Sequence, residues 1–216
     1  MKSLKVLGLA AIAAMAVMAF GAGSASALTK LCATGTPNVG ACPANKTEYS
    51  GHIETKLTPG TSATLTTSIT NLHCEESATT LTADTSTNVP PATTVTGSVT
   101  AFTLGKCKTT AGQACTATAE GLPYVAHFEG TVEGLTNTSS LRITGKKFKT
   151  VCGFIINCTF STAEEVLHGH NISSPRTTTE WTVNKVPLAR AGGLCPATAE
   201  LDASYEVTTP AGFTVH

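Results

Sequence analysis

Three side chains in one short segment have the types and spacing of a metal site. Glu164, His168 and His170 share parity, so an extended strand would present a carboxylate and two imidazoles on one face. Such groups bind zinc in hydrolytic enzymes, where the metal activates a water molecule. A surface loop around Gly169 explains the same residues more simply, because spacing does not supply the hydrogen bonds that orient metal ligands. A metal-dependent hydrolase is therefore the last of three hypotheses, and no metal or other cofactor is predicted.

No other pattern predicts a catalytic residue. The carboxylate doublets Glu75-Glu76 and Glu164-Glu165 place neighbours on opposite faces of a strand, so neither doublet forms a convergent acid and base. The chain contains no G-x-S-x-G motif. The single tryptophan, Trp181, is expected to pack in the core rather than to stack on a sugar. We therefore expect a protein that is not an enzyme.

The eight cysteines follow an N-terminal segment with the features of an export signal. A short basic head precedes an apolar run from Val6 to Phe20, and Ala25-Ser26-Ala27 fits a cleavage site. The apolar run is shorter than the roughly 20 residues needed to span a membrane. We predict a signal peptide over 1–27 and a mature chain without a membrane span. The protein is then secreted or held at the cell surface, where cysteines form disulfides.

Turn positions predict which cysteines pair. Facing residues of an antiparallel hairpin lie equally far from its turn, and the midpoint of Cys74 and Cys107 falls between Pro90 and Pro91. The same rule favours four pairs: Cys32–Cys42, Cys74–Cys107, Cys115–Cys152 and Cys158–Cys195. A Cys107–Cys115 pair, centred on Ala111-Gly112, remains the main alternative. Cys152–Cys158 is rejected because an extended strand would hold their Cα atoms about 20 Å apart. Zinc knuckles are rejected because the cysteine spacings are too long.

Alternating apolar residues predict the elements that carry these groups. Apolar side chains occupy every second position from Ala197 to Val207, which is typical of a strand with one buried face. Residues 152–160 repeat the pattern, whereas 161–167 could form one or two helical turns. We predict an all-β protein, an antiparallel β-sandwich or partly closed barrel. Residues 28–216 form one domain in this prediction, and 28–46 is an N-terminal segment closed by a disulfide.

The composition argues against nucleic acid as a partner. Charged residues make up 13% of the chain, against about 25% in an average soluble protein, and the formal net charge is zero. Phosphate binding needs clustered Lys and Arg, and the densest basic patch is only Arg142 with Lys146, Lys147 and Lys149. We interpret this patch as a solvated hairpin. Threonine and serine supply most of the polarity, as expected for exposed faces of strands.

Three features of the chain carry a resemblance: the signal peptide, the Thr-rich strands, and the segment Gly193-Leu194-Cys195-Pro196 with the strand that follows it to Val207. In these features the chain resembles a set of predicted secreted proteins from soil bacteria of high genomic GC content. That set carries no established activity, so the resemblance implies only a bacterial exported protein. Our first hypothesis is a non-enzymatic structural or interaction module, such as a cell-envelope component. The second is a binder of a small ligand or polysaccharide, and the metal-dependent hydrolase is the third.

Overall fold

The structure is a computed structural model that describes residues 29–34, 42, 47–84, 94–130, 138–154, 156–171, 179–193 and 195–215. The predicted signal peptide over 1–27 lies outside these residues. The described residues contain no helix, and accordingly none that is long and apolar enough to cross a membrane. The all-β prediction is confirmed.

Fifteen strands account for most of the described chain. They are β1 (Leu31–Ala33), β2 (Thr47–Glu48), β3 (Gly51–Leu57), β4 (Ala63–Thr67), β5 (Asn71–Ala83), β6 (Val95–Thr109), β7 (Ala114–Ala119), β8 (Tyr124–Glu129), β9 (Thr138–Thr144), β10 (Lys147–Cys152), β11 (Ile156–Ser161), β12 (Glu164–Asn171), β13 (Thr179–Gly193), β14 (Thr198–Thr209) and β15 (Thr214–Val215). All pairings between them are antiparallel.

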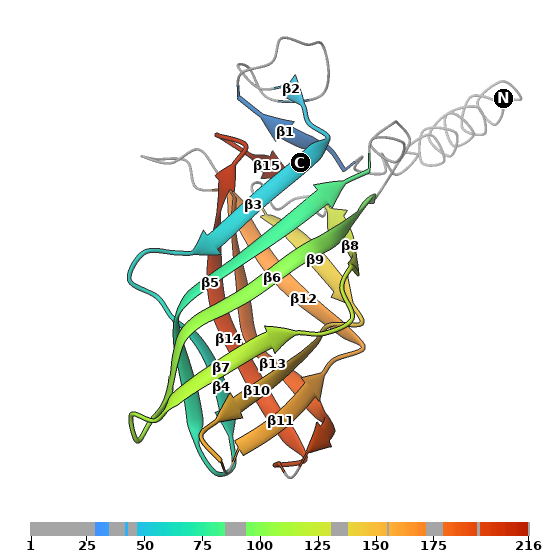
Figure 1. Cartoon of the computed structure of the whole chain (residues 1–216). Helices are drawn as coiled ribbons and strands as arrows, with labels where there is room; N and C mark the ends of the chain where they lie inside the picture. Colours follow the sequence, from blue (N-terminus) through green and yellow to red (C-terminus); the bar gives the residue numbers. More distant parts are fainter. Residues whose placement is uncertain are drawn as a thin grey trace, which may run out of the picture.

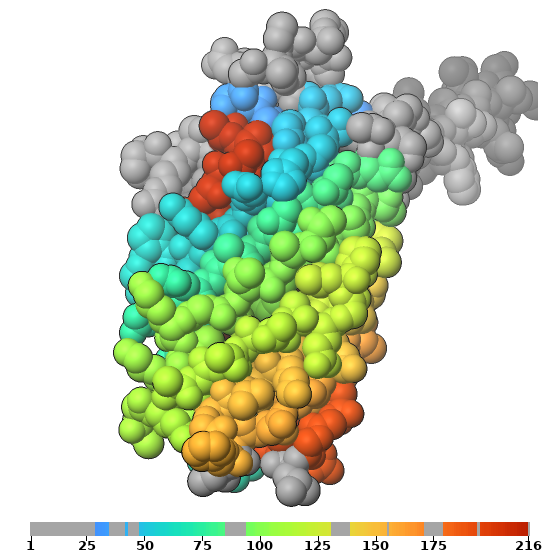
Figure 2. Space-filling model, in the orientation of Figure 1, coloured from blue at the N-terminus to red at the C-terminus, as the bar shows by residue number. Residues whose placement is uncertain are grey.

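Strand pairing closes the large sheet on itself. The barrel wall consists of eight segments, which we call arms. Four arms are the long strands β5, β6, β13 and β14. Each of the other four arms is interrupted and consists of two strands: β3 and β4, β7 and β8, β9 and β10, and β11 and β12. Each arm pairs with the next along the chain, and β14 returns to pair with both β3 and β4. The result is an antiparallel meander in barrel form (Figure 1), whose strands cross the visible face as oblique bands in Figure 2.

The predicted alternation of buried and exposed residues holds along β14 from Thr198 to Tyr205, whereas Glu206, expected on the solvated face, is only 7% exposed. Leu201, Tyr205 and Val207 are buried, as the period of two requires. Trp181, on the neighbouring β13, is also buried, and its ring packs against Phe128 and Phe213 with centroid distances of 5.9 and 5.8 Å. The prediction that the tryptophan serves the core is confirmed.

A small second sheet covers one end of the barrel. Its strand order is β15-β1-β2, so residues from both ends of the described chain pair there, Leu31 opposite Val215. Phe213, just before this sheet, and Val215, within it, are both fully buried. Lys30, with 3% of its side chain exposed, forms an ion pair of 2.7 Å with Glu48 at this end. We call this end the cap.

Two expectations about local structure are wrong. Residues 161–167 form no helix, because β11 runs to Ser161 and β12 begins at Glu164; pairing in the sheet overrides the weak helical pattern. Residues 152–160 are not one extended strand. The chain reverses at Gly153, which adopts a φ of 57°, so that Cys152 faces Ile156 across a tight hairpin.

Candidate functional site

The three potential metal ligands lie together on the outer face of β12, but other partners engage two of them. Glu164 accepts a hydrogen bond of 2.9 Å from Arg142, and His170 lies 3.5 Å from Glu180. Four residues along a strand separate Glu164 from His168 by about 13 Å, too far for one ion. The described residues contain no group of three or more side chains placed to hold a metal. The predicted shared face is therefore present without a metal-binding geometry.

Arg142 also contacts Glu129 on the neighbouring strand, at 3.1 Å. These two carboxylates raise the pKa of the guanidinium, with Glu129 the larger cause. The arrangement joins β8, β9 and β12 across the outer surface. Because its members are partly exposed, it contributes little to stability.

The interior contains an ion pair that the sequence analysis missed. Lys146 was expected in a solvated basic patch, but its side chain is 5% exposed and its Nζ lies 2.7 Å from Oε2 of the fully buried Glu165. The same Nζ lies 4.3 Å from the centroid of the Phe102 ring. Neither oxygen of Glu165 has an aligned hydrogen bond, so the contact with Lys146 is an electrostatic one. The patch prediction is wrong for Lys146.

A cavity beside this pair is too small to be a ligand pocket. Its volume is about 20 Å³, room for about one water molecule, and its lining includes Lys146, Trp181 and Tyr205. Burial raises the pKa of the Tyr205 phenol, whose oxygen lies 3.0 Å from the hydroxyl of Ser77. Ligand sites usually measure about 300–1,000 Å³, so the barrel interior functions as a packed core.

The structure contains the four disulfides expected from the turn positions. They join Cys32–Cys42, Cys74–Cys107, Cys115–Cys152 and Cys158–Cys195. The argument against Cys152–Cys158 was nevertheless wrong, because these residues lie on the two arms of a tight hairpin rather than along one strand.

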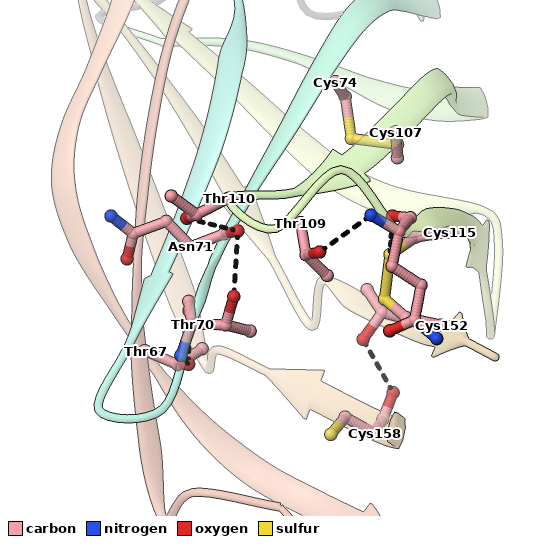
Figure 3. The surroundings of a disulfide bond; sticks show 12 residues. Thr67, Thr70, Asn71, Cys74, Cys107, Thr109, Thr110, Cys115, Cys152 and Cys158 are labelled. Atoms are coloured by element: carbon pink, nitrogen blue, oxygen red, sulfur yellow. Dashed lines mark hydrogen bonds between the residues drawn. A yellow bond between two sulfur atoms is a disulfide. The ribbon is translucent and has the colours of Figure 1, made fainter. Parts of the chain in front are cut away.

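Three of these disulfides lie toward the end of the barrel opposite the cap. We call this the disulfide end and define it by the turns at 68–70, 110–113, 153–154 and 195–197. Side-chain hydrogen bonds brace two of these turns: the Thr67 hydroxyl donates to the Thr70 carbonyl at 2.6 Å, and the Thr110 hydroxyl donates to the Asn71 carbonyl at 3.3 Å, the second of which Figure 3 shows. Cross-links and braced turns favour one fixed shape for this end.

The disulfide end also carries exposed apolar side chains. Ile69 and Phe154 occupy two of its turns and are 65% and 107% exposed. Between these turns lies an apolar cavity of about 20 Å³, whose lining includes Ile69 and Ile156. The third large exposed hydrophobic side chain among the described residues, Val125, lies on β8 in the barrel wall. Sequence alternation missed Phe154, because it assigned this residue to a continuous strand.

No protein-family model matches this chain, and no match was found among curated proteins or solved structures.

Proposed function

We propose that the chain is a non-enzymatic protein exported to the cell surface or the medium, where it acts as an interaction module through its disulfide end. The signal-like N-terminus, the resemblance to predicted secreted bacterial proteins and four disulfides support export. The observation that carries the proposed contact surface is the exposure of Ile69, on a hydrogen-bonded turn, and of Phe154, on the turn that follows the disulfide-bonded Cys152.

The geometry of the disulfide end favours contact through a projecting side chain rather than through a pocket that receives a ligand. Phe154 is as exposed as a free side chain, whereas the cavity lined by Ile69 and Ile156 has room for only about one water molecule. A larger hollow at this end, about 590 Å³ beside Ile69 and Thr110, is wide open to solvent, so neither space encloses a small ligand. A projecting aromatic ring on a fixed turn is the kind of anchor that fills an apolar pocket on another protein at low entropic cost. The partner of this proposal is therefore a protein with an apolar recess.

Polysaccharide binding has less support. Sugars stack on exposed aromatic rings, but Trp181, Tyr124 and Tyr205 are each at most 3% exposed. Among the described residues, Phe154 is the only large aromatic side chain that is exposed. A single ring is a poor platform for a glycan and a sufficient anchor for a protein contact.

Site-specific photocrosslinking tests this function. A photoreactive phenylalanine analogue at position 154 keeps the aromatic ring and, in cells that export the protein, should yield one protein adduct of defined mass. The additional change Ile69→Ser should abolish the adduct. Purified wild-type protein should compete for adduct formation, and the Phe154→Ser variant should not.

Position 125 supplies the matched control, because Val125 is 49% exposed but lies in the barrel wall. The analogue placed there should give no adduct. Equal adducts at positions 125 and 154, or none at either, would overturn the proposed contact surface. An adduct composed only of two copies of this chain would overturn the proposal of a different partner. Phe154→Ser should change the free energy of unfolding by no more than about 0.5 kcal/mol, so misfolding would not explain its failure to compete.

A further inference from the structure

We propose that Cys74, Cys107, Cys115 and Cys152 form an exchangeable disulfide row, in which reduction of the Cys115–Cys152 bridge transfers a free thiol to Cys74. The proposal concerns the redox chemistry of the barrel wall and does not depend on the proposed partner. It rests on the order in which the sheet register places these four side chains.

The four cysteines face one another in sequence across β5, β6, β7 and β10. Cys74 is opposite Cys107, Cys107 is opposite Cys115, and Cys115 is opposite Cys152. The first and last of these contacts are disulfides, whereas the middle contact is not bonded. Figure 3 shows the two bridges on neighbouring strands.

The middle contact has a spacing that permits a disulfide. Directly opposed residues of antiparallel strands have Cα atoms about 4.5–5.5 Å apart, and disulfides span about 4.4–6.8 Å. A Cys107–Cys115 bridge therefore needs no change of strand register. It would close the hairpin of β6 and β7, whose turn contains Ala111 and Gly112.

Burial determines which sulfur of the row an external thiol can attack first. Cys115 is partly exposed, whereas Cys74, Cys107 and Cys152 are each 2% exposed. A small-molecule thiolate attacks the sulfur of Cys115, forms a mixed disulfide there and displaces the thiolate of Cys152. A second small thiolate attacks the outer sulfur of that mixed disulfide, which releases Cys115 as a thiolate and forms the external disulfide.

The Cys115 thiolate is then opposite the Cys74–Cys107 bridge. It attacks the sulfur of Cys107, a Cys107–Cys115 bond forms, and Cys74 departs as a thiolate. Two external thiols have become one external disulfide, and the protein has exchanged two bridges for one bridge and two thiols at Cys74 and Cys152. The two links between β5 and β6 and between β7 and β10 are replaced by one within a hairpin.

The variant Cys152→Ser tests the exchange step without an added reductant. It leaves Cys115 as the one cysteine without its native partner. After incubation without oxygen near the thiol pKa of about 8.5, acid quenching stops exchange, and alkylation under denaturing conditions marks free thiols for peptide mapping. We expect Cys74 to gain the thiol that Cys115 loses, in a one-to-one ratio, with a Cys107–Cys115 peptide. A thiol that remains wholly on Cys115, with Cys74–Cys107 intact, would overturn the proposal.

The matched control is Cys42→Ser, which frees Cys32 in the cap. The strand neighbours of Cys32 are Thr214 and Glu48, so its thiol should stay in place. The wild-type protein provides a second test that does not need a folded variant. Glutathione is raised until the Cys115–Cys152 bridge opens in the native state, and the labels from this row should then fall on Cys74 and Cys152. Labels on Cys115 and Cys152 would contradict the inference.

Discussion

Replacing Gly169 with alanine would place a methyl group where the barrel interior has no space for it. An added Cβ would lie 2.5 Å from Cδ1 and 2.7 Å from Nε1 of Trp181, and 2.4 Å from the hydroxyl oxygen of Ser139. The serine hydroxyl can rotate away, but the indole ring cannot move freely because Phe128 and Phe213 pack against it. The cost therefore arises mainly at Trp181.

The size of this cost follows from the distances. Carbon atoms in contact prefer separations of about 3.5–4.0 Å, so the ring must retreat by about 1 Å from a site in which it is 1% exposed. Overpacking a close-packed core costs about 1–3 kcal/mol. We expect the upper end for Gly169→Ala, about 3 kcal/mol. For a domain of this size that corresponds to a decrease in Tm of about 6–12 °C.

Thermal and denaturant unfolding, followed by circular dichroism and by the fluorescence of the only tryptophan, measures the effect. Gly192→Ala is the matched control, since its Cβ would lie 3.8 Å from Thr159, an ordinary contact. Adding Trp181→Phe to Gly169→Ala, followed by circular dichroism alone because the tryptophan is gone, should show a coupling of at least about 1 kcal/mol, since the smaller ring relieves the overlap. If the two alanine variants unfold within about 0.5 kcal/mol of each other, the packing argument is refuted.

Two further predictions concern buried titratable groups. Lys146→Met leaves Glu165 charged and unpaired, so equilibrium unfolding should show a loss of about 3–5 kcal/mol; the added change Glu165→Leu should recover most of it, and an unrecovered loss would show that the pair is not its cause. Burial raises the pKa values of Tyr49, Tyr124 and Tyr205 above the ordinary 10.0, so phenolate absorbance should develop above pH 10 in the folded protein. Because the unfolded chain then releases protons first, stability should fall as pH rises above 10, and tyrosine ionisation at 10 in the native state would contradict this.

The features predictable from the sequence are those that depend on local periodicity and turn position. Alternation along β14 identified its buried face, because side chains of any strand alternate between two faces. The midpoint rule identified Cys74–Cys107 because β5 and β6 form a simple hairpin. It also identified Cys115–Cys152, since β8 and β9 form a hairpin between β7 and β10 and the midpoints of the two strand pairs differ by only one residue.

The features that were missed depend on where an arm of the barrel is interrupted. Lys146 faces inward because the chain turns at Gly145 between β9 and β10, and no periodicity in its neighbourhood marks that turn as directed into the core. The sequence did contain a signal for the burial of Glu165, because this residue has the same parity as the buried Leu167 on β12. The closure of the barrel was also beyond the sequence, because it requires β14 to pair with β3 and β4 over a long separation.

The pairing of Leu31 with Val215 has a consequence for the nascent chain. Residues of β1 must wait for those of β15, the latest of the described strands to be made, before the β15-β1-β2 sheet can form. Phe213 and Val215 also arrive late, and until they do, one mouth of the barrel lacks part of its apolar filling. Until Phe213 is in place, the Trp181 ring therefore lacks one of the two aromatic rings that pack against it.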